Sequence, residues 1–224
     1  MVSRMFIILL VSLTLASCGG GSTWQDDPQT HIVRKGETLF SIAWRYGKDP
    51  AAVARWNGLG DGSLIYPGQV LRMTPPSGGS QRSASTGTSN RQSLPSIPAQ
   101  PPPPWGWPTR GKIAVEFGGK PGSGTGVLID GRPGQAVVAA ASGRVVYAGG
   151  GLIGYGQLII LKHNDTYLSA YGHNAKLLVK EGQAVRKGQQ IATMGSSGTN
   201  SVKLHFELRR LGKPVDPLTL LPKR

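Results

Sequence analysis

The segment Lys203-Leu204-His205-Phe206-Glu207 lies near the C-terminus, and most of it belongs to a run from Leu204 to Leu208 that is mainly apolar. Similar short runs precede it, separated by glycines: Val137-Val138-Ala139, Arg144-Val145-Val146-Tyr147, Leu158-Ile159-Ile160-Leu161, Leu177-Leu178-Val179 and Gln190-Ile191-Ala192. Short apolar runs at regular spacing with turns between them are typical of antiparallel strands. The C-terminal half of the chain is therefore predicted to be an all-β domain.

This half of the chain resembles the lysostaphin-like (LytM-type) zinc peptidases from about Trp107 to Pro222. The landmarks that carry the resemblance follow one another in order: Ser142-Gly143-Arg144-Val145-Val146-Tyr147, Gly154-Tyr155-Gly156, Tyr171-Gly172-His173, Gly195-Ser196-Ser197-Gly198, His205-Phe206-Glu207 and Gly212-Lys213-Pro214-Val215-Asp216-Pro217. The resemblance implies a split-sheet domain over residues 107–224 with a groove that holds a substrate.

The zinc ligands of that family are mostly replaced in this chain. Active members bind zinc through His-x-Gly-x-Asp, which falls here on Gly124-Thr125-Gly126-Val127-Leu128, so glycine and leucine replace two ligands. The resemblance retains the third ligand as His205 and one catalytic histidine as His173, whereas Lys203 replaces the other catalytic histidine. Because zinc catalysis needs three protein ligands and an open position for water, we predict no metal site, no cofactor and no catalytic residue.

A shifted metal site is the alternative. Asp130 lies two residues beyond Leu128, and strand periodicity places both side chains on one face. Asp130, His173 and His205 would then make an active zinc endopeptidase. Against it, a two-residue step moves a carboxylate by about 6.6 Å, and Asp130-Gly131 is typical of a turn.

The N-terminus indicates export. Arg4 precedes the apolar run Met5–Val11, and Leu15-Ala16-Ser17-Cys18 follows. This resembles a bacterial lipoprotein signal, which implies removal of residues 1–17 and lipid attachment at Cys18. An ordinary secretion signal is the alternative, and either one places the mature chain outside the cytoplasm. Because Gly19 rather than aspartate follows, the resemblance implies an outer-membrane anchor facing the periplasm, with residues 18–29 as a glycine-rich tether.

The chain is strongly basic, with a formal net charge of +14. Removal of residues 1–17, where Arg4 is the one charged side chain, leaves +13. We expect no nucleic-acid partner for an exported, membrane-tethered chain that shows no basic helix or base-stacking aromatic motif. Acidic peptidoglycan stems or an acidic protein fit the charge better, and a generally solvated basic surface is the alternative.

Residues 30–74 are predicted to form a small α+β unit in the order strand, helix, helix, strand. The strands are expected at His31–Arg34 and Val70–Met73. Apolar residues at helical spacing indicate the first helix: Leu39, Ile42, Ala43 and Tyr46. Thr38 fits its N-cap, and Asp49-Pro50 opens the second helix because aspartate caps well and proline suits the first helical position.

The same unit resembles a LysM module, which binds the glycan of peptidoglycan. The matching motifs are Gly36-Glu37-Thr38-Leu39, Ile42-Ala43, Trp56-Asn57-Gly58-Leu59 and Tyr66-Pro67-Gly68-Gln69. The resemblance implies that two loops contact the glycan through Gly36, Glu37, Thr38, Leu39, Ser63, Leu64 and Ile65. Trp44 and Trp56 are alternative sugar-stacking residues, although their helical spacing favours burial. His31 is expected to be structural.

Residues 75–106 are predicted to be a disordered linker. They are rich in Ser, Gly, Gln and Pro, end close to Pro101–Pro104, and cannot bury enough apolar surface to offset the entropy of ordering. A flexible chain of this length spans about 30 Å.

This combination of modules resembles the NlpD/EnvC group of LytM-like proteins. Members of that group do not cut peptidoglycan but activate N-acetylmuramoyl-L-alanine amidases that separate daughter cells. The resemblance implies a partner-binding groove at Leu128, Tyr155, His173, Lys203 and His205. The alternatives are the shifted-site endopeptidase and a passive wall anchor, and His173 and His205 are also consistent with a purely structural hydrogen-bonded pair.

Overall fold

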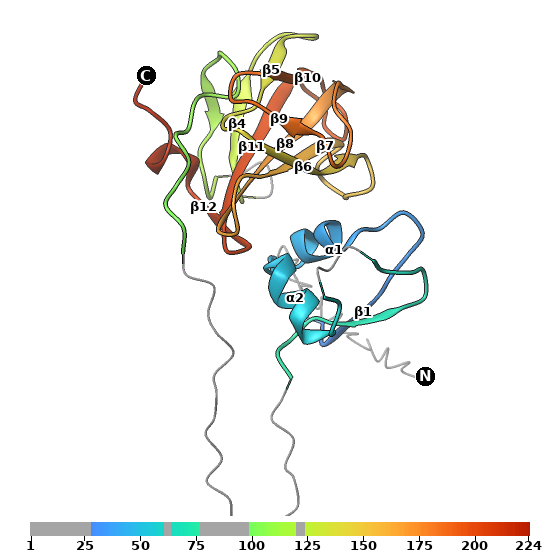
Figure 1. The fold of residues 1–224 in the computed structure, drawn as a ribbon. Coiled ribbons are helices and arrows are strands. Elements are labelled where there is room, and N and C mark those ends of the chain that lie inside the picture. The colour runs from blue at the N-terminus through green and yellow to red at the C-terminus, as the bar shows by residue number, and fades with distance from the viewer. Residues whose placement is uncertain (1–27, 61–63, 77–98, 120–123) are drawn as a thin grey trace, which may run out of the picture.

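The computed structural model describes residues 28–60, 64–76, 99–119 and 124–224. The predicted signal segment, Cys18 and Ser63 lie outside these ranges. The described residues form an N-terminal module and a C-terminal domain (Figure 1). None of their helices has the length and apolar character needed to cross a membrane.

The N-terminal module has the predicted βααβ order. Its elements are β1 (Thr30–Ile32), α1 (Leu39–Arg45), α2 (Pro50–Trp56) and β2 (Val70–Arg72). The two strands pair antiparallel, with His31 opposite Leu71. Its core is made by Val33, Leu39, Ile42, Ala43, Val53, Ala54, Leu71 and Met73.

Both helices begin where the sequence predicts. The Thr38 side chain accepts a hydrogen bond from the backbone N–H of Ser41 at 3.0 Å, and the Ser41 hydroxyl accepts from the N–H of Thr38 at 2.9 Å. Asp49 caps α2 through the N–H groups of Ala51 and Ala52. These bonds satisfy N–H groups that a helix start otherwise leaves unpaired.

The C-terminal domain is an antiparallel sheet, as predicted. Its elements are β3 (Ile113–Val115), β4 (Val127–Asp130), β5 (Ala136–Val138), β6 (Gly143–Gly149), β7 (Gln157–Lys162), β8 (Tyr167–Leu177), β9 (Ala184–Val185), β10 (Gln190–Met194), β11 (Lys203–Arg210), β12 (Lys213–Val215) and the 3-10 helix η1 (Pro217–Thr219). The main strand order is β3-β4-β11-β8-β7-β6-β9. β10 branches from β8 to pair with β5, and β12 pairs with β11.

The strand expected at Leu177–Val179 is misplaced. β8 starts at Tyr167 and ends at Leu177, so the expected run overlaps only its last residue. The sequence pattern misses most of β8 because polar residues such as Ser169 and Asn174 interrupt the apolar run while being fully buried. Both are hydrogen-bonded, which is the condition for burying a polar side chain.

The predicted linker extends too far towards the C-terminus. Trp105 is buried in the core of the C-terminal domain and contacts the ring of His163, with centroids 4.9 Å apart. Its carbonyl accepts a hydrogen bond from Lys187 Nζ at 3.0 Å. Residues 99–106 therefore pack along the domain. The free energy gained by burying the Trp105 indole offsets the entropy lost when this short polar stretch is ordered. Composition alone does not reveal this effect.

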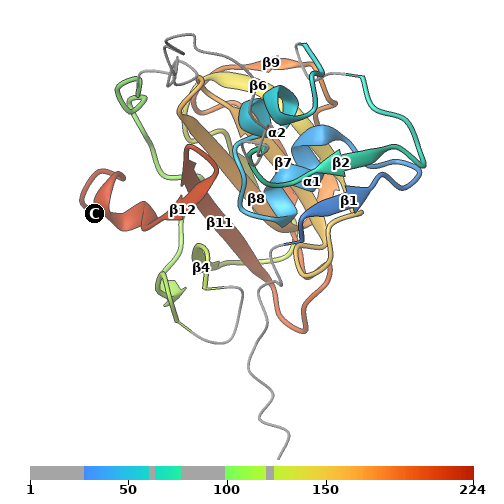
Figure 2. The same cartoon turned by 90° about the horizontal axis from the view of Figure 1, so that it is seen from below.

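The two units pack against each other. Helix α1 lies over strands β7 and β8 (Figure 2), and an apolar cluster joins it to their outer face. This inter-module cluster consists of Trp44, Tyr147, Leu152, Tyr155, Leu158, Ile160, Leu168 and Ala170, with Phe40 and Val146 at its edge. Trp44 was predicted to be buried and is 2% exposed, but it packs on the C-terminal domain rather than in its own module. The α1 face that bears Trp44 and Phe40 therefore belongs to the interface.

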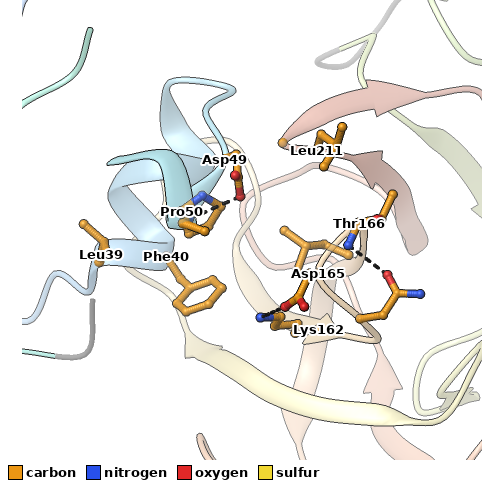
Figure 3. A pocket seen from close by; sticks show the side chains of 12 residues that line it. Leu39, Phe40, Asp49, Pro50, Lys162, Asp165, Thr166 and Leu211 are labelled. Atoms are coloured by element: carbon orange, nitrogen blue, oxygen red, sulfur yellow. Dashed lines mark hydrogen bonds and ion pairs between the residues drawn. The ribbon is translucent and has the colours of Figure 1, made fainter. Parts of the chain in front are cut away.

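The turn between β11 and β12 also touches the N-terminal module. Gly212 has a φ of +78°, and a Cβ atom there would collide with the backbone of Lys48 and Asp49. Beside this contact a hollow of about 80 Å³ separates Phe40 and Pro50 from the β7–β8 turn, where Lys162 and Asp165 form an ion pair of 2.7 Å (Figure 3). The β11–β12 turn therefore lies in direct contact with the segment before α2.

Candidate functional site

Strand β11 presents a row of polar side chains on one face. Lys203, His205, Glu207 and Arg209 alternate along the strand with Leu204, Phe206 and Leu208, which lie in the core. Alternation of this kind places the polar residues together on the opposite face. This face carries Lys203 and His205, two of the residues predicted to line the groove.

The structure brings four of the five predicted groove residues together. His205 lies opposite Leu128 on β4 and opposite Gly172 on β8. Its ring centroid is 5.2 Å from that of Tyr155 and 6.0 Å from that of His173. These four side chains are each 8% exposed or less. Lys203, two residues before His205, is half-buried at the edge of the group, opposite Asp130.

His173 is held in an unusual backbone conformation. Its φ is +62°, in the left-handed region that residues other than glycine seldom adopt. Its Nδ1 donates to the Ser197 carbonyl at 2.9 Å, so the neutral ring carries its proton there and leaves Nε2 as an acceptor. Burial lowers the pKa of His173 below 6.5, and the nearby His205 and Lys203 act in the same direction. The ring is therefore neutral at pH 7.

Glu207 is the centre of the polar row. Its Oε1 accepts from Arg209 Nε at 2.6 Å, and its Oε2 accepts from Thr125, Tyr155 and His205 at 2.9, 3.1 and 3.2 Å. Burial alone would raise the pKa of Glu207, but the charge of Arg209 and the bond from His205 hold that pKa below its ordinary value. Glu207 is thus a fully buried carboxylate with both oxygens occupied.

The last residue of the polar row, Arg209, contacts the N-terminal module. Arg209 is 2% exposed, its guanidinium lies 3.5 Å from the centroid of the Trp44 ring, and its Nη1 donates to the Trp44 carbonyl at 2.6 Å. Burial and the negative charge of Glu207 raise the pKa of Tyr155 to about 12, so this tyrosine stays protonated and acts as a donor. Sequence reasoning missed Glu207 and Arg209. Their signal was a pair of charged residues that alternate with Phe206 and Leu208 within one strand.

The residues of this site do not fit zinc. Leu128 occupies the position opposite His205 where the family has its aspartate, and the Oε2 of Glu207 accepts a hydrogen bond from Nε2 of His205. Asp130 is exposed and lies opposite Lys203 in the β4–β11 register, two residues along β11 from His205. Across residues 28–60, 64–76, 99–119 and 124–224, no three His, Cys, Asp or Glu side chains are grouped so that they could hold a metal ion. The site is a largely buried group of polar and aromatic side chains.

The predicted glycan-binding residues that the structure describes lie in two segments: Gly36–Leu39 at the start of α1, and Leu64 and Ile65 between α2 and β2. Gly36 has a φ of +82°, and Thr38 is the N-cap. Leu39 is buried in the core of the module, and Leu64 is 62% exposed. Glu37 accepts from His31 Nε2 at 2.7 Å and from Arg45 Nη1 at 2.6 Å, so it braces the loop.

The structure also places His31, His163 and Trp56. His31 is buried between Tyr46 and Glu37, as a structural residue would be. His163 bonds the Ser142 carbonyl at 2.8 Å and the Ser169 hydroxyl at 2.7 Å, which is likewise a structural role. Trp56 is half-buried against the core of its own module.

Comparison with known proteins agrees with this architecture. The family model for the LysM domain matches residues 31–74, and that for peptidase family M23 matches residues 122–217. A relative described as lipoprotein NlpD/LppB homolog from Pseudomonas aeruginosa is 43% identical over 236 residues, which cover 87% of this chain and 77% of the relative. The murein hydrolase activator NlpD of Salmonella typhimurium is 40% identical over 258 residues, which cover 87% and 68%.

Among solved structures, the catalytic domain of lysostaphin from Staphylococcus simulans aligns with 28% identity and a TM-score of 0.44, covering 48% of this chain and 90% of that domain. The family matches confirm the resemblance to LysM and LytM-type proteins that the motifs indicated. With its LysM and peptidase family M23 domains, the chain belongs to the NlpD/LppB lipoprotein family.

Proposed function

We propose that this protein is a non-catalytic activator of N-acetylmuramoyl-L-alanine amidases in the bacterial cell envelope. In this proposal the LysM domain holds the chain on peptidoglycan glycan strands, and the M23 domain engages the amidase at the division septum. The relatives described as murein hydrolase activators support the general role. The amidase is the more specific part of the proposal.

The observation that carries the proposal is the pairing of Leu128 with His205. An M23 peptidase needs a carboxylate at that point of the sheet, and leucine offers no ligand atom. A shape inherited from a peptide-binding groove remains useful without metal, because it can bind a helix or loop of a partner. Binding one conformation of the partner then shifts its population towards that conformation.

Lys203 is the proposed contact for an acidic side chain of the amidase. It is half-buried at the edge of the groove, whereas Leu128, Tyr155, His173 and His205 lie deeper. A partner would meet Lys203 first and the aromatic and histidine side chains afterwards. A lysine ammonium is a compact charge that suits contact with a single carboxylate.

Attachment at Cys18 is proposed to keep the protein at the outer membrane, facing the periplasm. Relatives named lipoproteins support a lipid anchor. Acyl chains on one cysteine give stable anchoring when more than one chain is present. The glycan contacts are proposed at the loops around Gly36–Leu39 and Ser63–Ile65. No role in nucleic-acid binding is proposed.

The test is amidase turnover on purified, dye-labelled sacculi. The soluble chain starting after Cys18 is added to a purified amidase, and dye release is compared with that from the amidase alone and from the chain alone. We expect release to rise strongly only when both proteins are present. Release by the chain alone would indicate an endopeptidase, and no rise with both would indicate a passive wall anchor.

A further inference from the structure

A second hollow lies on the interface between the two modules. It has a volume of about 380 Å³, within the range of small-ligand pockets. One wall is the loop from Arg34 to Glu37, ahead of α1, together with Tyr46. The other wall comes from the C-terminal domain, through Tyr147 and Ile153 around the β6–β7 connection. The loop that the LysM resemblance assigns to glycan therefore faces the M23 domain.

The LysM wall is basic and rigid. Arg34, Lys35 and Arg45 line the hollow together with one carboxylate, Glu37. That carboxylate is engaged within the module, since its oxygens accept from His31, from the Arg34 N–H at 2.9 Å and from Arg45. The hollow therefore has an excess of positive charge, which favours a ligand that carries carboxylates.

The wall from the C-terminal domain is apolar and ordered. Tyr147 lies in the inter-module cluster at 5% exposure, and its hydroxyl accepts from the Gly151 N–H at 2.9 Å. Ile153 is 92% exposed, more than any other large hydrophobic residue of the described chain. An aliphatic side chain held in water beside aromatic rings suits the C–H face of a sugar.

We propose that this hollow is a composite binding site for an amino sugar of the peptidoglycan strand that bears an acidic stem peptide. The basic LysM loop binds the acidic substituent, and Tyr147 and Ile153 of the M23 domain cover the face of the sugar ring. The site exists only while the two modules are packed together. A glycan bound there stabilises the packed arrangement, because a ligand stabilises the state that binds it. This inference rests on the proposed binding of peptidoglycan by the LysM domain.

The experiment uses the soluble chain starting after Cys18, with two substitutions of matched chemistry. Ile153→Asp places a charge in the proposed site, and Leu178→Asp places one at another exposed apolar residue of the same domain that does not line the hollow. Both positions are exposed, so neither change should unfold the chain. The probes are a soluble disaccharide-tetrapeptide from peptidoglycan and the neutral chitotetraose, measured by calorimetry.

We expect Ile153→Asp to weaken binding of the disaccharide-tetrapeptide about tenfold, the size expected for losing contact with one aliphatic side chain. Leu178→Asp should leave the affinity unchanged. Arg34→Gln should weaken binding of the acidic fragment more than that of chitotetraose. Equal affinity of the Ile153→Asp variant and the parent chain would overturn the composite site while leaving LysM binding intact. Equal loss of both probes in Arg34→Gln would overturn the recognition of a carboxylate.

Failure of the parent chain to bind sacculi in a pelleting assay is a different result. It would remove the peptidoglycan binding on which the proposed function depends, and the composite site with it. Binding of sacculi together with an unchanged Ile153→Asp affinity would remove the composite site alone. The two failures are therefore distinguishable.

Discussion

The guanidinium of Arg209 lies 3.5 Å from the centroid of the Trp44 ring, although the two residues are 165 positions apart. Arg209 also pairs with Glu207 at 2.6 Å, so one side chain connects the groove strand to the LysM helix. Strand β11 and the LysM domain are thus parts of one packed structure.

The first prediction concerns this arginine. Arg209→Ala leaves the fully buried carboxylate of Glu207 without its main counter-charge, so we expect the free energy of unfolding to fall by about 3–5 kcal/mol. Urea unfolding followed by circular dichroism measures it. Arg210 is the next residue and is exposed, so Arg210→Ala should stay within about 0.5 kcal/mol. Equal effects of the two substitutions would contradict the buried role of Arg209.

The second prediction separates the interface from the core of the LysM domain. Trp44 packs in the inter-module cluster, whereas Trp56 packs against the core of its own module. Trp44→Ala should therefore release the modules from each other, raising the radius of gyration in small-angle scattering while the LysM domain stays folded. Trp56→Ala should instead destabilise the LysM domain by an amount below the 3–5 kcal/mol of a fully buried tryptophan. An unchanged radius of gyration for Trp44→Ala would count against the interface.

Local sequence patterns predicted the individual units well. The Thr38 and Asp49 caps, the apolar stripe of α1 and the short runs of β6, β7 and β11 depend on neighbouring residues, and each is found where it was expected. Apolar periodicity failed at β8 because it contains the buried polar residues Ser169 and Asn174. The Ser169 hydroxyl bonds His163, and the Asn174 side-chain amide donates to the backbone carbonyls of Gln157 and Tyr171.

The docking of the units was not predictable from the sequence. A tryptophan on a short helix can be buried in the core of its own module or against another domain. The composition of the linker gave no reason to expect the two modules to contact each other. The Glu207–Arg209 pair was also missed, since a charged side chain in a strand usually faces water. Only the tertiary structure shows that Trp44 covers this pair.

The third prediction concerns pH. Burial, opposed in part by the bond to the Ser142 carbonyl, lowers the pKa of His163 from 6.5 to about 4. The unfolded chain takes up this proton near pH 6.5 and the folded chain only near pH 4. The contribution of His163 to stability is therefore complete above pH 6.5 and is lost as the pH falls from 6.5 to about 4.

Its size is at most about 3 kcal/mol, because the ring is only partly shielded from water. The test compares the free energy of unfolding of the parent chain and of His163→Gln between pH 7.5 and 4. His173 also has a lowered pKa and contributes in the same direction, so the difference between the two proteins isolates His163. Parallel curves would contradict the prediction.

The fourth prediction is that restoring one ligand does not restore the metal site. Leu128→Asp places a carboxylate beside His205 but supplies only two ligands, so we expect no stoichiometric zinc in equilibrium dialysis. The buried, unpaired carboxylate should lower the free energy of unfolding by about 3 kcal/mol or more. Leu128→Met is the matched control and should cost less than about 1.5 kcal/mol. Stoichiometric zinc in the Leu128→Asp variant would contradict this prediction, because it would show that the site supplies further ligands.

The fifth prediction tests the proposed amidase contact directly. Lys203→Glu reverses the charge at the groove edge, where the proposal places an acidic side chain of the partner, and like charges at such a contact weaken association. The concentration of this protein that gives half-maximal activation of the amidase should therefore rise about tenfold. That change corresponds to a loss of about 1.4 kcal/mol in binding free energy. Because Lys203 is partly exposed to solvent, the same variant should change the free energy of unfolding by less than about 1 kcal/mol.

Lys213→Glu is the control, because Lys213 is an exposed lysine of the same domain outside the groove and the substitution changes the net charge equally. A long-range effect of net charge would weaken activation in both variants, and raising the salt concentration would reduce both effects together. A specific contact at the groove would affect Lys203→Glu alone. Full activation by Lys203→Glu would remove Lys203 from the contact surface and require the partner to approach through another part of the domain.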